Sequence, residues 1–373
     1  MAIKNNAGQH LCIGITGTEL TTATRRLLKA VQPGGIILFA RNVDNADQLR
    51  AFTQSLRAEL PVSPFIAIDQ ENERVNRLRA IVGELPALAD IQRTGHADEF
   101  GRTIGRSLRD LGINLDFAPV LDLELCAPPT DNALRDRCWG KTAAEVVRWA
   151  GEFITGLEGT GVAACPKHFP GLGAATQDSH EHLPTITRRR EDLLAEDVRP
   201  FAELAPRLSA VMVGHGHYVA FDGEQPKPAS LSPVIVQDLL RRQIGFTGLV
   251  VTDDMEMGAI TRAGNFGTAV TGAVQAGADV VLVCHTPEKI LAAHEALSKM
   301  RIPPESAHRL ERLRKECLPA WPVTLPTTRR AQLESENPGR ARLEAADESC
   351  RGHVGYRDVV LPTRGRKNSF RKL

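Results

Sequence analysis

Eight short apolar runs, each followed by a polar turn and an amphipathic stretch, constrain the fold of this 373-residue chain more than any other feature. The runs comprise residues 11–16, 35–39, 64–68, 113–121, 161–165, 210–213, 248–252 and 279–284. The amphipathic stretches include residues 47–60, 99–111, 143–158, 189–204, 233–243, 265–276 and 288–300. Near-continuous apolar strands that alternate with helices are typical of parallel sheets. We therefore predict an α/β fold of the (β/α)8 TIM-barrel type, with a doubly wound open sheet as the alternative.

The pattern also predicts where this domain ends. Eight strand–helix units and a closing helix at 309–316 place the barrel within residues 8–318. Residues 319–373 are rich in Pro and Arg, carry a basic excess and show little periodicity, so we predict a C-terminal extension there. No GxGxxG motif follows the first apolar run, which argues against a dinucleotide-binding open sheet.

Polar side chains stand at the ends of several predicted strands. They are Asp69, Asp122, Lys167, His168, His215, Asp253 and Asp254. Each acid alone is explained equally well as a helix N-cap at a β→α junction. An unpaired carboxylate is costly to bury, however, and barrels place their chemistry at the C-terminal ends of their strands. The whole set therefore predicts an active site at that end of the barrel.

One segment combines a binding pair, a flexible connector and a proton carrier. Lys167 and His168 follow an apolar run and can donate hydrogen bonds to sugar hydroxyls. Residues 170–173, which include Pro and Gly, open a loop that ends with Asp178 and His180. A carboxylate that accepts a hydrogen bond from an imidazole fixes the tautomer of the ring and raises its proton affinity. The segment therefore indicates acid–base chemistry on a loop.

Composition limits the partners. A formal net charge of +1 and an aromatic content of 5% argue against nucleic-acid binding. The N-terminus lacks an apolar signal region, and no apolar run approaches about 18 residues. The seven widely spread cysteines fit buried, reduced thiols. We therefore expect a cytoplasmic protein with no membrane or nucleic-acid partner, present as a monomer or weak dimer.

No ligand spacing in the sequence supports a metal site. His168, His215, His217 and an Asp could contribute to zinc binding, but they lack the tight spacing of zinc ligands. We interpret His215 and His217, which flank a glycine at a strand end, as packing residues. We expect neither a metal nor a cofactor.

Three segments together resemble glycoside hydrolase family 3: residues 167–170, 178–180 and 251–257. More closely, they are similar to its single-domain β-N-acetylhexosaminidases of the peptidoglycan-recycling type. Other matching segments are residues 34–39, 67–71, 74–78, 112–123, 136–137, 228–233 and 276–284. The resemblance covers roughly residues 8–300 in the same order. The combination of motifs is specific, whereas any one of them alone is weak.

The resemblance implies a (β/α)8 barrel that hydrolyses terminal β-linked N-acetylglucosamine with retention. It implies that Asp253 is the nucleophile, that His180 is the general acid/base and that Asp178 is its partner. It also implies a set of sugar-binding residues: Asp69, Arg77, Arg137, Lys167 and His168. The usual substrate of the subgroup is a small carbohydrate, a muropeptide fragment in which N-acetylglucosamine is joined to 1,6-anhydro-N-acetylmuramic acid.

Three other functions are compatible with the residues: a β-glucosidase-like relative, a phosphorolytic relative and an inactive barrel that only binds sugar. Asp253 and Asp254 could also assist attack by the acetamido group of the substrate. Successive strand residues point in opposite directions, however, so only one of the two should face the site. That alternation favours a single protein nucleophile.

The sequence departs from the family pattern in two loops. Asn72 and Glu73 stand where the family often has two glycines, so we expect a different loop backbone. Residues 172–175 read Leu-Gly-Ala-Ala and lack two polar groups of the family motif. We expect the dynamics of this loop and the substrate preference to differ accordingly.

Overall fold

The computed structural model describes residues 7–126, 132–262 and 264–317, with side chains as far as residue 315. The predicted extension at 319–373 lies outside the described residues. The division of the chain at residue 318 therefore stays a prediction.

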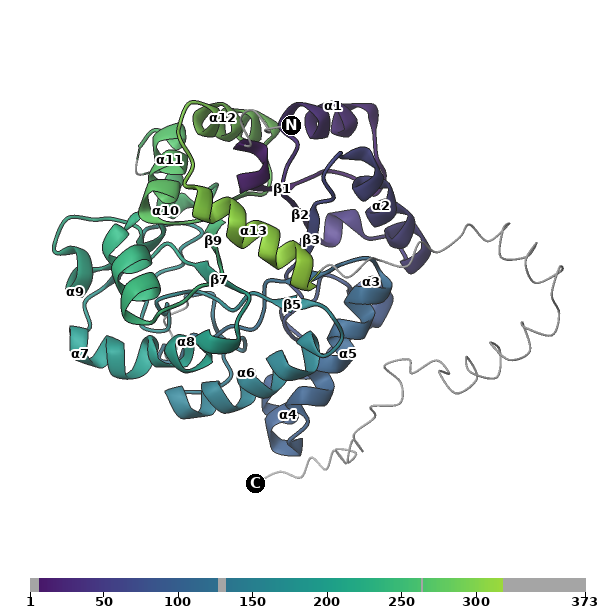
Figure 1. Ribbon diagram of the computed structural model, residues 1–373. Coiled ribbons are helices and arrows are strands. Elements are labelled where there is room, and N and C mark those ends of the chain that lie inside the picture. Colours follow the sequence, from purple (N-terminus) through teal and green to yellow (C-terminus); the bar gives the residue numbers. More distant parts are fainter. Residues whose placement is uncertain (1–6, 127–131, 263, 318–373) are drawn as a thin grey trace, which may run out of the picture. The chain divides into compact units, whose positions relative to one another are not determined.

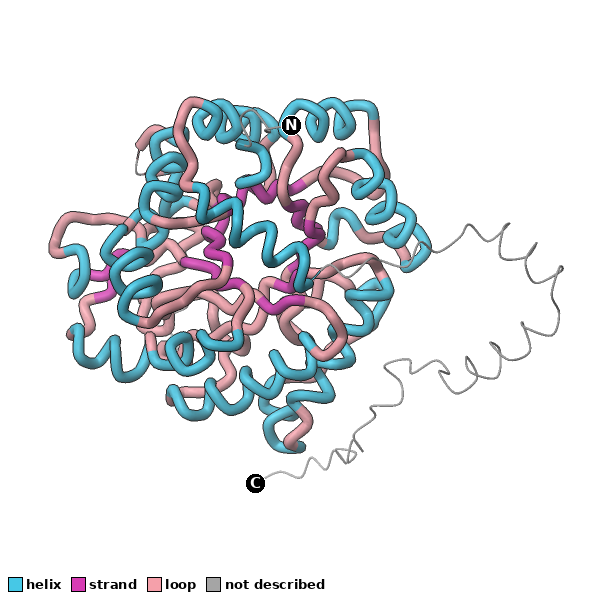
Figure 2. Tube along the Cα trace, viewed as in Figure 1, coloured by secondary structure: helices cyan, strands magenta, loops and turns pink. Residues whose placement is uncertain are grey.

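A parallel eight-stranded sheet forms the centre of the described chain (Figure 1). Its strands are β1 (Leu11–Gly14), β2 (Gly35–Leu38), β3 (Phe65–Ile68), β4 (Leu115–Asp116), β5 (Ala163–Ala164), β7 (Ala210–Val213), β9 (Leu249–Asp254) and β10 (Val280–Val283). The order of neighbours is β5-β4-β3-β2-β1-β10-β9-β7. The segment that follows β5 closes the ring against β7, since Phe169 N–H donates to Met212 O (2.9 Å) and Gly214 N–H donates to Phe169 O (3.0 Å). Figure 2 shows the resulting ring of strands inside a layer of helices, which confirms the predicted (β/α)8 barrel.

Each barrel strand arises from one of the eight apolar runs, but the run at 113–121 forms a shorter strand than expected. Only β4 pairs continuously there, because Pro119 has no N–H to donate to the ladder. Pairing resumes as an isolated bridge between Val120 and Lys167. A separate two-stranded parallel sheet of β6 (Thr185–Ile186) and β8 (His217–Tyr218) was not expected.

Helices surround the barrel. They are α1 (Thr22–Val31), α2 (Ala46–Glu59), α3 (Arg79–Val82), α4 (Leu88–Thr94), α5 (Ala97–Asp110), α6 (Ala143–Glu158), α7 (Arg190–Asp192), α8 (Arg199–Leu204), α9 (Val219–Asp222), α10 (Gly258–Thr261), α11 (Phe266–Ala276), α12 (Pro287–Ser298) and α13 (Pro304–Cys317). Two segments are π-helical, Leu193–Asp197 between α7 and α8, and Val234–Gln243. The amphipathic stretch at 143–158 coincides with α6, whereas the stretch at 189–204 is divided among α7, the π-helical turn and α8.

One cluster of buried residues lies inside the ring. Every second strand residue points inward, as in Ala210 and Met212 of β7 or Leu249 and Val251 of β9. Leu310 and Leu313 of α13 belong to the same buried cluster. Arg309 of α13 also donates to the carboxylate of Asp279, directly before β10. The closing helix therefore covers the N-terminal end of the barrel and leaves the C-terminal end for function.

Helix N-caps in the described part of the chain come from residues other than the strand-end acids. Side chains of Thr21, Asn45, Thr142 and Asn265 accept hydrogen bonds from the first turns of α1, α2, α6 and α11. Capping therefore does not explain why acids stand at the strand ends.

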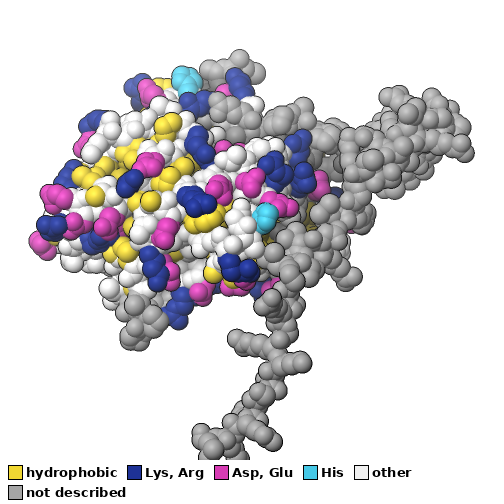
Figure 3. Space-filling view, turned by 90° about the horizontal axis from the view of Figure 1, so that it is seen from below, with side chains coloured by type: hydrophobic (Ala, Val, Ile, Leu, Met, Phe, Trp, Pro, Cys, Tyr) yellow, Lys and Arg dark blue, Asp and Glu magenta, His cyan; other side chains and the backbone are white. Residues whose placement is uncertain are grey.

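No helix within the described ranges is long and apolar enough to cross a membrane. On the face seen from below in Figure 1, acidic and basic side chains are interspersed (Figure 3).

Candidate active site

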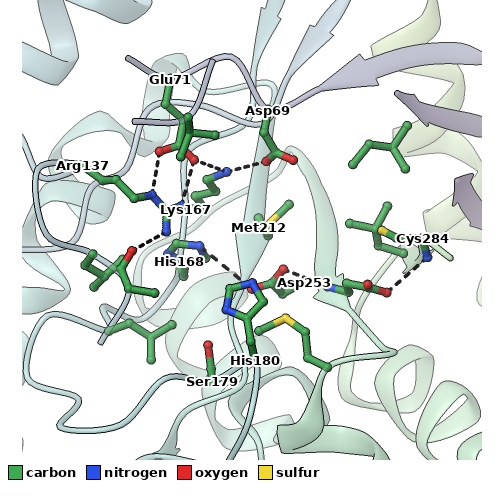
Figure 4. A pocket seen from close by; sticks show the side chains of 18 of the residues that line it. Asp69, Glu71, Arg137, Lys167, His168, Ser179, His180, Met212, Asp253 and Cys284 are labelled. Atoms are coloured by element: carbon green, nitrogen blue, oxygen red, sulfur yellow. Dashed lines mark hydrogen bonds and ion pairs between the residues drawn. The ribbon is translucent and has the colours of Figure 1, made fainter. Parts of the chain in front are cut away.

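A cavity of about 300 Å³ lies at the C-terminal ends of the barrel strands (Figure 4). Its lining includes Asp69, Arg77, Arg137, Lys167, His168, His180 and Asp253. Asp178, the remaining predicted site residue, hydrogen-bonds to His180 behind the lining. Apolar core side chains such as Met212 and Leu282 also line the cavity. Residues far apart in the sequence therefore meet in one pocket.

Two acids and two cations form one wall of this pocket. Lys167 Nζ lies 2.6 Å from Asp69 Oδ1 and 2.7 Å from Glu71 Oε1. Arg137 binds both oxygens of Glu71, each at 2.8 Å. Burial would raise the pKa of Glu71, but the two cations hold this pKa well below its usual range. The wall is therefore fixed by ion pairs, and it presents donors and acceptors to a polyhydroxylated ligand.

A buried carboxylate orients His168. Asp122 is fully buried, and its Oδ2 accepts a hydrogen bond from His168 Nδ1 at 2.6 Å. The other oxygen of Asp122 accepts from Leu172 N–H at 2.6 Å. His168 Nε2 thus faces the cavity, where it lies 4.0 Å from Asp253 Oδ2. The Asp122 contact fixes the ring orientation, as carboxylates commonly do for functional histidines.

Asp253 at the end of β9 remains ionised in this pocket. Burial would raise its pKa, but His168, His215 and a hydrogen bond from Asp254 N–H outweigh that effect. The hydrogen bond joins Asp254 N to Asp253 Oδ1 at 2.8 Å. The pKa of Asp253 therefore lies below its usual value, so a carboxylate faces the ligand space at neutral pH.

The loop after β5 brings His180 to the rim of the cavity. His180 Nδ1 donates to Asp178 Oδ1 at 2.7 Å, and the His180 backbone N–H donates to the same oxygen at 2.9 Å. Burial raises the pKa of Asp178, but these two donors more than offset it, so the pKa is lowered. Since Nδ1 is engaged, Nε2 is the ring nitrogen that can exchange a proton with a ligand.

The Arg77 side chain can donate a further hydrogen bond to a ligand. Its Nε is buried and lacks a hydrogen-bond partner in the described part of the chain, although its guanidinium lies 5.9 Å from the Phe39 ring centroid. A buried donor without a partner is costly. A ligand oxygen in the cavity would satisfy it, which is consistent with the predicted role of Arg77 in substrate binding.

Glu71 is the main residue that the sequence analysis left without a role. It is 5% exposed and joins Lys167 to Arg137, so the wall depends on it. The sequence spacing could have indicated a role for Glu71. This residue follows the strand-end residue Asp69 by two positions, and such spacing places both side chains on one side of an extended chain. Asp122, noted only as a strand-end acid, likewise proves to orient His168.

Asn72, at the first departure from the family pattern, is held by several hydrogen bonds. The Asn72 side chain is 1% exposed and accepts from the N–H groups of Arg74 (2.9 Å) and Val75 (3.3 Å). Its amide also donates to Asp136 O at 2.7 Å, next to Arg137. Asn72 therefore ties the Glu71 loop to the Arg137 loop. Residues 172–175 are the second segment that departs from the family pattern. There, Leu172 lines the cavity and its carbonyl accepts a hydrogen bond from the side-chain amide of Asn132.

Asp254 and His215 lie beside the candidate site and are held by hydrogen bonds of their own. Asp254 also lines the cavity, so the expected alternation holds only in part, yet its Oδ1 accepts from the N–H groups of Glu256 (3.0 Å) and Cys284 (3.2 Å). His215 is fully buried, and its ring contacts Ser230 Oγ at 2.8 Å and Asp254 O at 3.1 Å. This arrangement agrees with a packing role for His215.

Among the described residues, no group of three His, Cys, Asp or Glu side chains could hold a metal ion.

The pocket contains the groups that glycoside cleavage requires: an ionised carboxylate, a carboxylate-backed imidazole and a polar wall for sugar hydroxyls. Together with the barrel, they define the class as a (β/α)8 glycoside hydrolase. Residues 4–313 match the glycosyl hydrolase family 3 N-terminal domain, so the chain belongs to that family. The resemblance seen in the sequence is thereby confirmed.

Named relatives refine this assignment. The β-hexosaminidase of Pseudomonas aeruginosa (strain LESB58) is 34% identical over 335 residues, which cover 87% of this chain and 98% of that protein. The NagZ structure from Neisseria gonorrhoeae in complex with N-trifluoroacetyl-D-glucosamine has 32% identity and a TM-score of 0.72, and covers 81% of this chain and 88% of its own. These relatives show that the chain is a glycoside hydrolase that acts as a β-N-acetylhexosaminidase on a carbohydrate substrate.

A third relative is longer. The family 3 β-N-acetylglucosaminidase from Paenibacillus sp. str. FPU-7 has 36% identity and a TM-score of 0.82 over 87% of this chain. The present chain spans only 65% of that protein. The similarity therefore concerns only part of the longer protein.

Proposed function

We propose that the chain is a retaining exo-β-N-acetylglucosaminidase that acts through a covalent glycosyl–Asp253 intermediate. The observation that supports this proposal is that Asp253 and His180 line one cavity, with the charged wall of Asp69, Glu71, Arg137 and Lys167 beside them. A volume of about 300 Å³ is at the small end for ligand pockets, which favours binding of one terminal sugar.

In the first step, Asp253 attacks C1 of the sugar while His180 Nε2–H protonates the departing glycosidic oxygen. The C1–O bond breaks, an ester to Asp253 forms, and His180 becomes neutral. Asp178 keeps Nδ1 in its donor role throughout. In the second step, neutral His180 takes a proton from water, and the water oxygen attacks C1. The bond between C1 and Asp253 breaks, which regenerates the carboxylate and releases the sugar with its original β configuration.

The binding groups act on the same ring. Asp69, Lys167 and Arg137 would hydrogen-bond the hydroxyls, and Arg77 Nε would donate to a substrate oxygen. His168, 4.0 Å from Asp253, would keep the carboxylate oriented under C1. Because these contacts are fixed before the substrate arrives, little reorganisation is needed at the transition state.

We further propose a muropeptide fragment or a related β-linked glycoside as the physiological substrate, and a cytoplasmic role in peptidoglycan recycling. The sequence resemblance to the peptidoglycan-recycling type supports this choice, and the N-trifluoroacetyl-D-glucosamine in the Neisseria gonorrhoeae NagZ structure is consistent with an N-acylated glucosamine at the terminal position. The monomer or weak dimer expected from the sequence stays a prediction.

A 5-fluoro derivative of N-acetylglucosamine with a good leaving group is expected to inactivate the enzyme by accumulating the glycosyl ester on Asp253. Fluorine slows both steps by destabilising the oxocarbenium-like transition state, while the good leaving group keeps the first step fast. Mass spectrometry of a digest should find the added sugar on the peptide that spans residues 251–257. An inactivated enzyme with that peptide unlabelled would remove the covalent step from the proposal.

Nitrophenyl N-acetyl-β-glucosaminide is expected to be cleaved with kcat/KM about 10²-fold or more above that of nitrophenyl β-glucoside. The reason is that a site that hydrogen-bonds the acetamido group rejects ligands that lack this group. Inorganic phosphate should not accelerate either reaction, and N-acetylglucosamine rather than its 1-phosphate should be the product. Preference for the glucoside would support the β-glucosidase-like alternative, and a phosphorylated product would support the phosphorolytic one.

A further inference from the structure

The loop that carries His180 is attached at its tip to the segment that follows the nucleophile strand. Gly258 N–H donates to His180 O at 2.9 Å, and Ala259 N–H donates to Ser179 O at 3.4 Å. These donors are the first two residues of α10, which begins five positions after Asp253. The acid/base loop and the nucleophile are thus linked through one short turn.

Side-chain burial does not hold His180 in place, since its side chain is 63% exposed. At the base of the loop, Tyr218 Oη donates to Gly171 O (2.7 Å) and Asp122 accepts from Leu172 N–H (2.6 Å). Those contacts fix where the loop leaves the barrel but lie well before His180 in the sequence. The position of the imidazole over the cavity therefore depends on the backbone contacts at the start of α10.

This attachment requires a glycine at position 258. A Cβ on Gly258 would lie 2.3 Å from Glu181 O, 2.7 Å from Glu181 C and 2.8 Å from His180 O. All three are backbone atoms, so no side-chain rotation could relieve the overlap. Even a methyl group would push the loop away from α10 and break the Gly258 N–H to His180 O hydrogen bond.

We propose that Gly258 is a positioning residue for catalysis: it lets the 178–182 loop dock on the start of α10 and so places His180 over the departing oxygen. The proposal rests on the proposed function of His180 as the acid/base. Nothing in it requires Gly258 to touch the substrate, and Gly258 does not line the cavity.

The consequence differs between leaving groups. A phenyl glycoside needs proton donation to its leaving oxygen, whereas a 2,4-dinitrophenyl glycoside leaves without much assistance. Displacement of His180 should therefore lower kcat/KM for the phenyl substrate and spare the dinitrophenyl substrate. Partial loss of folded protein would lower both values equally, so the ratio between the two substrates isolates the positioning effect.

In the experiment, Gly258→Ala is compared with wild type on phenyl and 2,4-dinitrophenyl N-acetyl-β-glucosaminides. We expect kcat/KM to fall about tenfold or more for phenyl and less than about threefold for dinitrophenyl, as a fraction of the ~10²–10⁴-fold that general acid–base catalysis supplies. Gly272→Ala is the matched control, because a Cβ there would meet only Leu231 Cδ2 at 3.9 Å. It should leave both substrates unchanged.

A double-mutant cycle with His180→Ala separates this inference from the proposed function. If Gly258 acts through His180, Gly258→Ala should not change the substrate ratio any further in the His180→Ala background. A His180→Ala enzyme with an unchanged ratio would overturn the acid/base assignment itself. A normal ratio in Gly258→Ala, alongside an altered ratio in His180→Ala, would overturn only the role of Gly258.

Arg262→Ala serves if Gly258→Ala does not fold. Arg262 is exposed, so its removal should not unfold the chain, and its Nη1 contacts His182 Nδ1 at 3.1 Å on the same loop. We expect a change in the substrate ratio in the same direction, of about twofold or more, that again disappears in the His180→Ala background. An unchanged ratio in this variant would count against docking on α10.

Discussion

Replacing Asp253 with alanine is expected to lower kcat/KM for nitrophenyl N-acetyl-β-glucosaminide by about 10⁴-fold or more, because loss of a nucleophile removes the covalent route altogether. The substitution should not unfold the protein, since the Asp253 carboxylate accepts its hydrogen bond from the backbone N–H of Asp254 (2.8 Å) and the neighbouring side chains keep their own partners. His168, for example, retains Asp122 at 2.6 Å. Steady-state kinetics with the two purified enzymes measures the effect.

Azide should restore part of that activity, because a small anion can occupy the space left by the carboxylate and attack C1 from the same face. The product would be the α-glycosyl azide, of opposite configuration to the substrate, which NMR identifies. Asp254→Asn is the control: its Oδ1 can still accept from Glu256 and Cys284, so we expect a smaller loss and no azide rescue. Wild-type rates in Asp253→Ala would mean that this residue has no role in catalysis.

The barrel was predictable because its strands arise from near-continuous apolar runs, which is what burial on both faces demands. The parts that were not predicted have weak patterns. Helix α1 buries only Thr24, Leu28 and Val31, too narrow a stripe to stand out. Helix α10 has four residues, about one helical turn, which is too short to show an amphipathic pattern. The positions of these elements depend on packing against the barrel rather than on their own sequences.

The candidate site was predictable for residues on strand ends and for the Asp178–His180 pair, and not for the other loop residues. Asp69, Lys167, His168 and Asp253 follow apolar runs, so topology alone brings them to one end of the barrel. Arg77 and Arg137 stand on loops whose course no periodicity describes, and only the family resemblance pointed to them. The attachment of the His180 loop to Gly258 depends on a close backbone contact, and that contact leaves no pattern in the sequence.

Glutamine in place of Glu71 is expected to lower both stability and activity, because the carboxylate neutralises two buried cations at once. Arg137 would lose its paired contacts of 2.8 Å, while Lys167 would keep Asp69 at 2.6 Å. Removing one partner of a buried ion pair typically costs about 3–5 kcal/mol. We expect a loss of about 3 kcal/mol in the free energy of unfolding in urea. Displacement of Arg137 by about 1 Å would lower kcat/KM by roughly 10²-fold.

The pH dependence of stability distinguishes loss of this charge from a simple packing defect. The pKa of Glu71 in the folded protein lies well below its unfolded value of about 4.3, so its contribution is fully present above that pH and declines as the pH falls towards the folded pKa. The difference in unfolding free energy between wild type and Glu71→Gln should therefore shrink by about 1.4 kcal/mol for each pH unit below about 4.3. Glu73→Gln, two positions along the same loop, should differ from wild type by less than about 0.5 kcal/mol at every pH. A difference for Glu71→Gln that stays constant down to about pH 3.5 would mean that Glu71 does not stabilise the fold through its charge.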